Sequence, residues 1–253
     1  MLLERAQQES KFTLDDGELF NLYVISLKRT ENRKNQTINS LEQQHIQFTI
    51  FEAVDGLADL DDGLVKKYAG KKKTRRLFAT AHMSRHELLE LYNKYEMHSL
   101  RRESLRALLH ERLRFGVYLS HVRLWEAMLE FGLPFIVVLE DDVDLRHDFR
   151  ESFTSLLKQL PKTWDLLYLN GSYKKYGLKY SEDLVQSRGG VGAFGYAISK
   201  KGASYYLQRA ALRSNRALDL MMNEEVVAGR VLAFHAVPPL VDIIDSVKTS
   251  LAY

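Results

Sequence analysis

The sequence predicts an α/β fold in which a mostly parallel β-sheet carries helices on both faces. Short apolar runs rich in β-branched residues alternate with segments of helical pattern, which is typical of βαβ units. One such run, Ile136 to Leu139, leads directly into acidic residues, as at the carboxyl end of a buried strand where α/β folds bind ligands. A length of 253 residues and a hydrophobic content of 45% allow one large core, so we expect a single domain over residues 1–253.

The first βαβ unit is predicted near the start of the chain. Residues 22–27 (LYVISL) and 48–53 (FTIFEA) have the pattern of short strands. Between them Thr30 can cap a polar helix that continues to about Gln44. These two strands should therefore lie parallel in the sheet.

A helical insertion is predicted over about residues 57–115, after a turn at Asp55 and Gly56. The stretch is charged, has few turn residues and carries leucines at helical spacing. Ser84 and Glu87 have the spacing of a capping box, which would start one of its helices.

An amphipathic helix over about residues 117–130 is expected to precede the acidic strand end. Its apolar stripe consists of Leu119, Val122, Trp125, Met128 and Leu129. After the acids, Asp148 can cap a further helix that Pro161 stops, and residues 165–169 (DLLYL) form another predicted strand. Strand and helix thus continue to alternate.

The acidic strand end contains Glu140, Asp141 and Asp142 in succession. Like charges this close raise one another's pKa and cost free energy unless a cation lies among them. Mg²⁺ and Mn²⁺ are commonly bound by one or two carboxylates, with the other ligands coming from water and substrate phosphate. The residues alone leave two interpretations open, a divalent metal site or a solvated loop.

The composition excludes several classes of protein. A net charge of +3, from 36 Lys and Arg against 33 Asp and Glu, is too small to indicate nucleic acid as the main partner. The absence of cysteine excludes a disulfide scaffold, a thiolate metal site and a cysteine nucleophile. Residues 1–10 lack the pattern of a signal peptide and no apolar run approaches the ~20 residues of a membrane span, so we expect a cytoplasmic protein.

A basic run from Lys71 to Arg76 (KKKTRR) lies within the predicted insertion. Most such runs are solvated loops. The run could instead contact nucleic acid, an acidic acceptor, or the anionic lipid of the inner membrane face as a peripheral attachment. We expect it to be dispensable for the chemistry.

Several blocks of the sequence occur in an order that resembles a known family. They are LYVISLKRTENR (22–33), FEAVDG (51–56), GVYLSHVRLWE (116–126), VVLEDDV (137–143), WDLLYL (164–169), GYAISKKGA (195–203), LD (218–219) and PPLV (238–241). Together they resemble glycosyltransferase family 25, which includes lipopolysaccharide sugar transferases and collagen hydroxylysine galactosyltransferases. The resemblance implies a GT-A nucleotide-diphospho-sugar fold, a UDP-sugar donor, a Mn²⁺ or Mg²⁺ ion and inversion at the sugar carbon.

The resemblance also implies roles for single residues. Metal ligands would be Glu140 and Asp142, with His235 as a further ligand, although burial is the more common role for such a histidine. Donor contacts would be Ser26, Arg29, Arg33, Asp55, Gly56, Ser120 and Asp141. Arg29 and Arg33 are four residues apart, so both guanidinium groups could meet a diphosphate from one helix face; an exposed helix start is the alternative.

The catalytic base is assigned to Asp219. A single displacement requires a carboxylate or histidine beside the attacking hydroxyl, on the side of the sugar away from the diphosphate. Asp219 is an isolated acid in the apolar segment RALDLMM, where partial burial would raise its pKa, and an aspartate recurs in this block of the family. A capping role for Asp219 stays open, and Asp165, at a strand start, is the reserve candidate.

We therefore expect a metal-dependent, inverting transferase. It would move galactose or glucose from a UDP-sugar to a glycan or lipid-linked acceptor such as lipopolysaccharide or lipooligosaccharide. The alternative is a catalytically inactive GT-A relative that serves as a sugar- or protein-binding module, because a fold does not guarantee a reaction.

Overall fold

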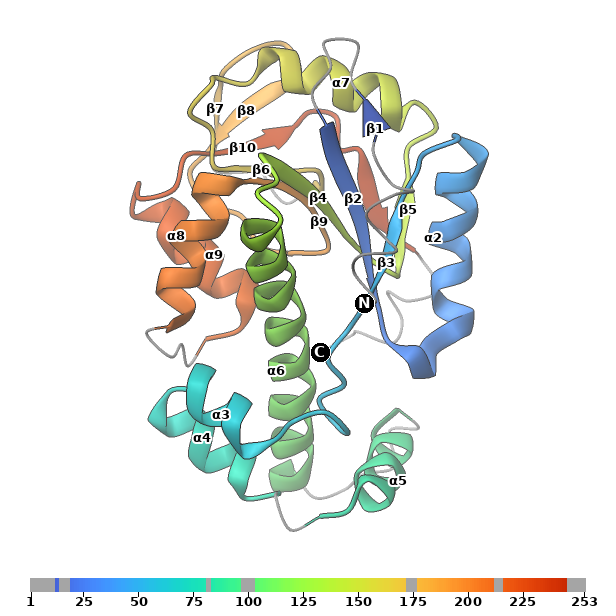
Figure 1. The fold of residues 1–253 in the computed structure, drawn as a ribbon, viewed down its shortest axis with the longest axis vertical. Helices are drawn as coiled ribbons and strands as arrows, with labels where there is room; N and C mark the ends of the chain where they lie inside the picture. Colours follow the sequence, from blue (N-terminus) through green and yellow to red (C-terminus); the bar gives the residue numbers. More distant parts are fainter. Residues whose placement is uncertain are drawn as a thin grey trace.

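The computed structural model describes residues 12–13, 19–80, 83–96, 103–171, 177–211 and 216–244. Within these residues one large mixed sheet of nine strands has the order β1-β2-β4-β9-β6-β10-β8-β7, with β3 also paired to β2 (Figure 1). Its strands are β1 (Phe12–Thr13), β2 (Leu19–Ser26), β3 (Thr49–Glu52), β4 (Phe135–Glu140), β6 (Leu166–Tyr168), β7 (Gly177–Lys179), β8 (Leu184–Ser187), β9 (Gly195–Ser199) and β10 (Ala233–Ala236). Helices accompany this sheet, so the predicted α/β class is confirmed.

The predicted opening βαβ unit is also confirmed. β2 and β3 are parallel and are joined through a short 3₁₀ turn, η1 (Lys28–Thr30), and the helix α2 (Glu31–Gln43). β4 runs parallel to β2 on its other side. The sheet as a whole is mixed rather than mostly parallel, because β9 begins beside the carboxyl end of β4, where Gly195 pairs with Leu139, and runs back between β4 and β6.

The remaining helices surround the sheet and extend beyond one end of it (Figure 1). They are α3 (Asp62–Tyr68), α4 (Lys71–Phe78), α5 (Arg85–Glu96), α6 (Glu103–Glu130), α7 (Phe149–Gln159), α8 (Lys200–Ala211) and α9 (Leu218–Val227). The second half of α6 packs on the sheet, where His121 and Trp125 contact Tyr196 of β9. α8 lies beside α6 and α9 lies close to both in Figure 1.

The described chain between β3 and β4 is helical, in the region where the sequence predicts an insertion. α3, α4, α5 and the first half of α6 lie beyond the sheet at one end of the molecule (Figure 1). α6 begins at Glu103, so the helix predicted from residue 117 is the second half of a 28-residue helix. Besides the main core, a small apolar cluster here contains Leu57, Leu88 and Leu109.

Of two residues predicted to cap helices, Ser84 makes its capping hydrogen bonds and Asp148 does not. The capping box is present before α5, since the Ser84 N–H donates to Glu87 Oε2 over 2.7 Å and the Glu87 N–H donates to Ser84 Oγ over 3.2 Å. Asp148 occupies the N-cap of α7 but makes no side-chain capping bond. Its carboxylate instead accepts hydrogen bonds from Arg146, over 2.9 Å at Nη2, and from Ser152.

A two-stranded sheet holds the chain just after the acidic strand end. β5 (Val143–Leu145) pairs antiparallel with β11 (Val241–Ile243). The Ile244 N–H also donates to the carbonyl oxygen of Asp142 over 2.9 Å. The C-terminal part of the described chain thus fixes the backbone that follows Glu140. No helix in the described ranges is long and apolar enough to cross a membrane.

Candidate functional site

The carboxyl ends of β2, β3 and β4 meet at one edge of the sheet. In the two parallel registers Ile25 is opposite both Phe51 and Glu140, so the residues that follow these strands are neighbours. Ser26 Oγ donates a 2.7 Å hydrogen bond to Asp141 Oδ2, and both side chains are buried. The structure therefore brings the predicted donor contact Ser26 to the acidic strand end.

Arg29 and Asp55 form an ion pair beside this contact, with 2.9 Å between Nε and Oδ2. The Arg29 guanidinium also lies over the ring of Tyr92 from α5, 4.5 Å from its centroid. The other Asp55 oxygen accepts the Leu57 N–H over 2.9 Å, which stabilises the predicted turn. A guanidinium has five N–H donors, so Arg29 fits the binding of an anion at this edge. Arg33 lies on α2, and its side chain is outside the described residues.

α6 approaches the turn after β3 so closely that glycine is required on both sides. A Cβ atom on Gly56 would lie 2.1 Å from the Arg112 carbonyl oxygen, and one on Gly116 would lie 2.6 Å from that of Val54. Ser120 Oγ accepts the Val54 N–H and donates to the Gly116 carbonyl, each over 2.8 Å. The predicted donor contacts Gly56 and Ser120 thus hold the turn against the helix, and Ser120 is fully buried.

A buried polar chain connects Glu140 to α6. His121 Nε2 lies 3.5 Å from Glu140 Oε1, and its Nδ1 lies 2.7 Å from the Tyr196 hydroxyl. Trp125 Nε1 donates to the same hydroxyl over 3.0 Å. Burial raises the pKa of Tyr196 well above its usual value, so the phenol keeps its proton at neutral pH. The sequence did not indicate a role for Tyr196. The pattern of apolar residues predicts a strand here, but it does not show which helix packs against the tyrosine hydroxyl.

The loop of residues 188–194 crosses to the same edge of the sheet and is held by two asparagines. Asn170, just after β6, donates from Nδ2 to the Gly192 carbonyl over 2.8 Å. Asn223 of α9 accepts the Gly190 N–H over 2.8 Å. The φ angle of Gly192 is +91°, a conformation that favours glycine. The glycine-rich sequence thus allows this loop to lie between β6 and α9.

Asp219 is the second residue of α9 and is half-buried. Ala217 occupies the N-cap of this helix, and the Asp219 carboxylate accepts the Leu220 N–H over 2.8 Å. After burial itself, the charge of Asp219 is the next cause that raises the pKa of Tyr168, the last residue of β6. Asp219 is therefore within electrostatic reach of Tyr168.

The structure does not bring His235 or Asp165 to the acidic strand end. β9 and β6 lie between β10 and β4, which places His235 about 14 Å from β4 across the sheet. His235 Nε2 lies 2.9 Å from Ser187 Oγ, and burial lowers the pKa of His235 to about 4. Asp165 precedes β6, at the opposite edge, where its carboxylate binds Lys201 Nζ at 2.9 Å and the Leu232 N–H at 2.8 Å.

The carboxylates at the end of β4 are the candidate ligands for a metal ion. Among the described residues, no three His, Asp or Glu side chains converge into a metal-binding cluster. Mg²⁺ does not need such a cluster, because it usually binds one or two carboxylates together with water and substrate phosphates. Glu140 and Asp142 have the oxygen ligands that such a cation prefers, and the described residues form no complete protein site for it.

Comparison with known families decides the assignment. The family model described as glycosyltransferase family 25 (LPS biosynthesis protein) matches residues 20–222. The chain belongs to glycosyltransferase family 25. Every predicted site residue except His235 falls within the matched range. The GT-A class that the resemblance implied agrees with this membership and with the mixed α/β sheet.

The curated relatives in family 25 are much longer proteins. Procollagen galactosyltransferase 2 from Mus musculus is 28% identical over 193 residues, which cover 72% of this chain and 26% of the relative. A glycosyltransferase 25 family member from Aedes aegypti is 27% identical, covering 80% of this chain and 30% of the relative. The inactive glycosyltransferase 25 family member 3 from Homo sapiens is 25% identical, covering 87% of this chain and 30% of the relative. The chain thus spans less than a third of the length of these relatives.

Solved structures resemble the chain only weakly. Mouse xyloside xylosyltransferase 1 in its apo form has a TM-score of 0.40 at 10% identity, covering 84% of this chain and 83% of that one. The crystal structure of A197 from STIV also has a TM-score of 0.40 at 10% identity, covering 88% of this chain and 82% of that one.

Proposed function

We propose that this family 25 chain is a metal-dependent, inverting glycosyltransferase that moves a hexose from a UDP-sugar to a glycan acceptor. The observation that carries the proposal is the meeting of three parallel strand ends, where Ser26 binds Asp141 beside the Arg29–Asp55 pair. Ligands of α/β folds bind at such an edge. Family membership supports sugar transfer as the reaction at this edge.

The donor would bind with its diphosphate between Arg29 and the end of β4. Arg29 supplies a guanidinium held in place by Asp55, and Ser26 orients the Asp141 carboxylate. Glu140 and Asp142 would hold Mn²⁺ or Mg²⁺. When bound, the cation would act as a Lewis acid that stabilises the charge of the departing UDP. His121 contacts the Glu140 carboxylate from inside the protein and so restricts its orientation.

The acceptor hydroxyl would lose its proton to Asp219. This carboxylate lies on α9, within electrostatic reach of Tyr168 at the end of β6, and would face the donor from a different element. That separation suits a base that acts on the side of the sugar away from the diphosphate, as inversion requires. Asp165 lies at the opposite edge of the sheet and binds Lys201, so it would not reach the acceptor.

The name of the mouse relative favours galactose as the transferred sugar, with glucose as the second choice. The family description favours an acceptor of the lipopolysaccharide type, which would be glycosylated at the cytoplasmic side of a membrane. Both choices are parts of the proposal.

The test is UDP release from UDP-galactose and UDP-glucose, with Mn²⁺ or with a chelator, combined with calorimetry of UDP binding. Asp142→Ala should weaken Mn²⁺-dependent UDP binding at least about tenfold, because a ligand to the cation is lost. Asp144→Ala is the matched control, since Asp144 is exposed, lies two residues further on and binds Ser40. Equal UDP affinity with Mn²⁺ and with chelator would contradict metal dependence.

The same assay with acceptor tests the base. Asp219→Asn should reduce transfer by roughly 10²–10⁴-fold while UDP affinity stays unchanged, because only proton removal is lost. Near-normal transfer by this variant, or a product that retains the donor's anomeric configuration, would refute the assignment.

A second candidate function is a binding module without turnover. Several matched relatives carry the word inactive in their names, among them the human protein that covers 87% of this chain. Metal-dependent UDP-sugar binding without UDP release, for every acceptor offered, would favour this function over catalysis.

A further inference from the structure

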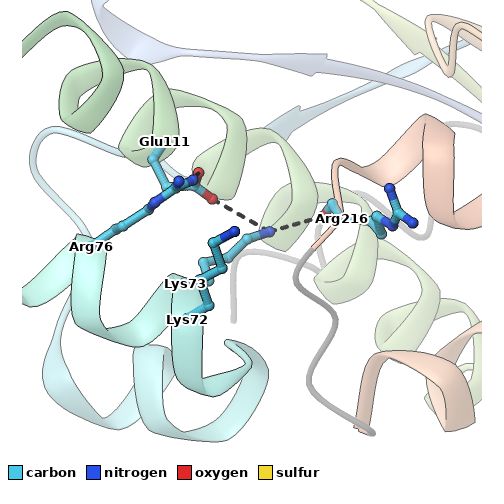
Figure 2. Close-up of a pocket in the computed structure, with 5 residues that line it drawn as sticks. All are labelled: Lys72, Lys73, Arg76, Glu111 and Arg216. Carbon is cyan, nitrogen blue, oxygen red and sulfur yellow. Dashed lines mark hydrogen bonds and ion pairs between the residues drawn. The ribbon is translucent and has the colours of Figure 1, made fainter. Parts of the chain in front are cut away.

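A small basic hollow lies between α4, α6 and the segment that leads into α9. It is lined by Lys72, Lys73, Arg76, Glu111 and Arg216 (Figure 2). Its volume is about 200 Å³, which is less than the roughly 300–1,000 Å³ of pockets that bury drug-sized ligands. The hollow therefore combines an excess of positive charge with room for a group smaller than a nucleotide.

Lys73 is the buried member of this group, with 3% of its surface exposed. Its Nζ donates to the Arg216 carbonyl over 2.8 Å and lies 3.7 Å from Glu111 Oε1. Burial lowers the pKa of Lys73, the Glu111 charge opposes this shift, and the Arg114 charge adds to it. A cation in this position would be stabilised by a further negative charge placed in the hollow.

Glu111 is the one carboxylate among the lining residues, and two cations share it. Arg76 Nη1 lies 3.4 Å from Glu111 Oε2, and Lys73 Nζ lies 3.7 Å from the other oxygen. Both separations exceed the roughly 2.7–2.9 Å of strong charge-assisted hydrogen bonds. Lys72 is exposed, and in the described ranges no ion pair joins it to a carboxylate. The hollow thus has three cations from α4 and one acid, which pairs with two of them.

Arg216 has a different part in the hollow. Its carbonyl binds Lys73, while its guanidinium pairs with Glu224 of α9 at 2.9 Å. In Figure 2 its side chain extends away from Lys73. The cations available to an anion are therefore those of α4, and Arg216 closes the hollow with its backbone.

The hollow is distinct from the donor edge. Glu111 and His121 are ten residues apart on α6, which is about 15 Å along the helix axis. Arg112, the next residue after Glu111, points to another side and donates to the Gly56 carbonyl. An anion in the hollow would therefore be a different group from a diphosphate beside Ser26 and Asp141.

We propose that this hollow binds a phosphate group on the acceptor, so that the acceptor class is a phosphorylated glycan. The identification of the phosphate carrier as the acceptor rests on the proposed transferase function, whereas anion binding itself does not. A flat membrane surface fits the geometry less well, because Lys73 is buried in the wall and reaches its partners inside the molecule (Figure 2). Phosphate oxygens, by contrast, accept hydrogen bonds from several cations that converge.

The test measures binding of inorganic phosphate and of glucose 6-phosphate to the full chain by calorimetry. The double variant Lys72→Ser with Arg76→Ser removes two cations whose side chains reach solvent and leaves buried Lys73 in place. The matched control, Lys66→Ser with Lys67→Ser, removes the same charge from α3. We expect phosphate affinity to fall about tenfold or more in the first variant and less than about twofold in the control, since charge-assisted bonds are lost only there.

Equal phosphate affinity in the two double variants would overturn the proposal. So would binding to vesicles of phosphatidylcholine with phosphatidylglycerol, lost only in the first variant, if neither soluble phosphate bound the wild type. Transfer to a phosphorylated acceptor should fall in the first variant, with transfer to the dephosphorylated acceptor and UDP release unchanged. If the wild type turned over no UDP-sugar but phosphate binding still depended on Lys72 and Arg76, the anion site would stand and the transferase proposal would fail.

Discussion

At the scale of single residues, the hydroxyl of Tyr196 joins the acidic strand end to the core. It accepts the Trp125 N–H and contacts His121 Nδ1, whose other ring nitrogen faces Glu140. All three aromatic residues are fully buried, so water does not replace a lost partner. A buried polar group left without its hydrogen bond costs about 1–3 kcal/mol.

Tyr196→Phe should therefore lower the free energy of unfolding by about 2 kcal/mol, measured in urea. It should also weaken metal-dependent UDP binding, because His121 is no longer held against Glu140. Tyr206→Phe is the matched control, since that hydroxyl is buried nearby and donates only over 3.2 Å to the Met222 carbonyl. Equal loss of UDP affinity in the two variants would show that the Tyr196 hydroxyl has no special link to the site.

Some of the predicted site residues lie together in the structure and others do not, and the difference depends on how much of each position the sequence indicates. Ser26 and Asp141 were predicted as donor contacts and do meet, because each directly follows or ends a strand in a parallel set. His235 and Asp165 lie elsewhere, because their positions depend on the order of strands and on the end of the strand at which each stands. Hydrophobic periodicity indicates that a strand exists and does not indicate its neighbours.

At the scale of elements, the close approach of α6 to the turn after β3 positions the donor edge. Gly116→Ala would place a Cβ atom 2.6 Å from the Val54 carbonyl oxygen and 2.7 Å from the Gly56 nitrogen. Both are backbone atoms, so the helix or the turn must move. We expect a loss of about 1–3 kcal/mol in the free energy of unfolding and weaker UDP binding, as in other overpacked cores.

Gly63→Ala in α3 is the control for the helical glycine itself. Its added methyl group would meet only the Asp61 side chain, at 3.1 Å. Alanine favours a helix over glycine by up to about 1 kcal/mol, which offsets that contact. If urea denaturation showed the same stability change for both glycine variants, the close approach of α6 would not be the cause.

The individual helices and strands also show why parts of the fold were predictable from the sequence. The β2-α2-β3 unit is present as predicted, and the stripe predicted for the second half of α6 is buried at Leu119, Val122, Trp125 and Met128. The first half of α6 was assigned to the insertion because the sequence there is charged and has few turn residues, and in the structure its Leu109 packs in the small cluster. The antiparallel course of β9 was not predicted, since its sequence GYAIS gives no direction relative to its neighbours.

At the scale of the whole molecule, the described chain has two apolar clusters of very different size. The main one extends across the large sheet, and the second contains only Leu57, Leu88 and Leu109 with a few partly buried neighbours. Segments with few buried apolar contacts open at lower free energy than the core. α3 and α4 contribute Val65, Tyr68 and Leu77 to the main cluster, so it is α5, with Leu88 in the small cluster, that should open independently of the sheet.

Hydrogen exchange tests this separation. Leu88→Ala should speed amide exchange in α5 and leave β4 and β6 protected, because the lost packing energy of about 2–5 kcal/mol belongs to the small cluster. Leu167→Ala, the matched change in fully buried β6, should speed exchange in the sheet as well. Uniform loss of protection in Leu88→Ala would mean that both clusters unfold as one unit.

The small cluster has a direct connection to the donor edge, which gives the exchange experiment a functional readout. Leu57 directly follows Asp55 and Gly56, and Arg112 bonds Gly56 from α6. Tyr92 of α5 also lies under the Arg29 guanidinium. If UDP and Mn²⁺ bind at this edge, they stabilise the closed form by mass action and should slow exchange in α5. Unchanged α5 exchange at saturating UDP and Mn²⁺ would show that donor binding does not depend on this end of the molecule.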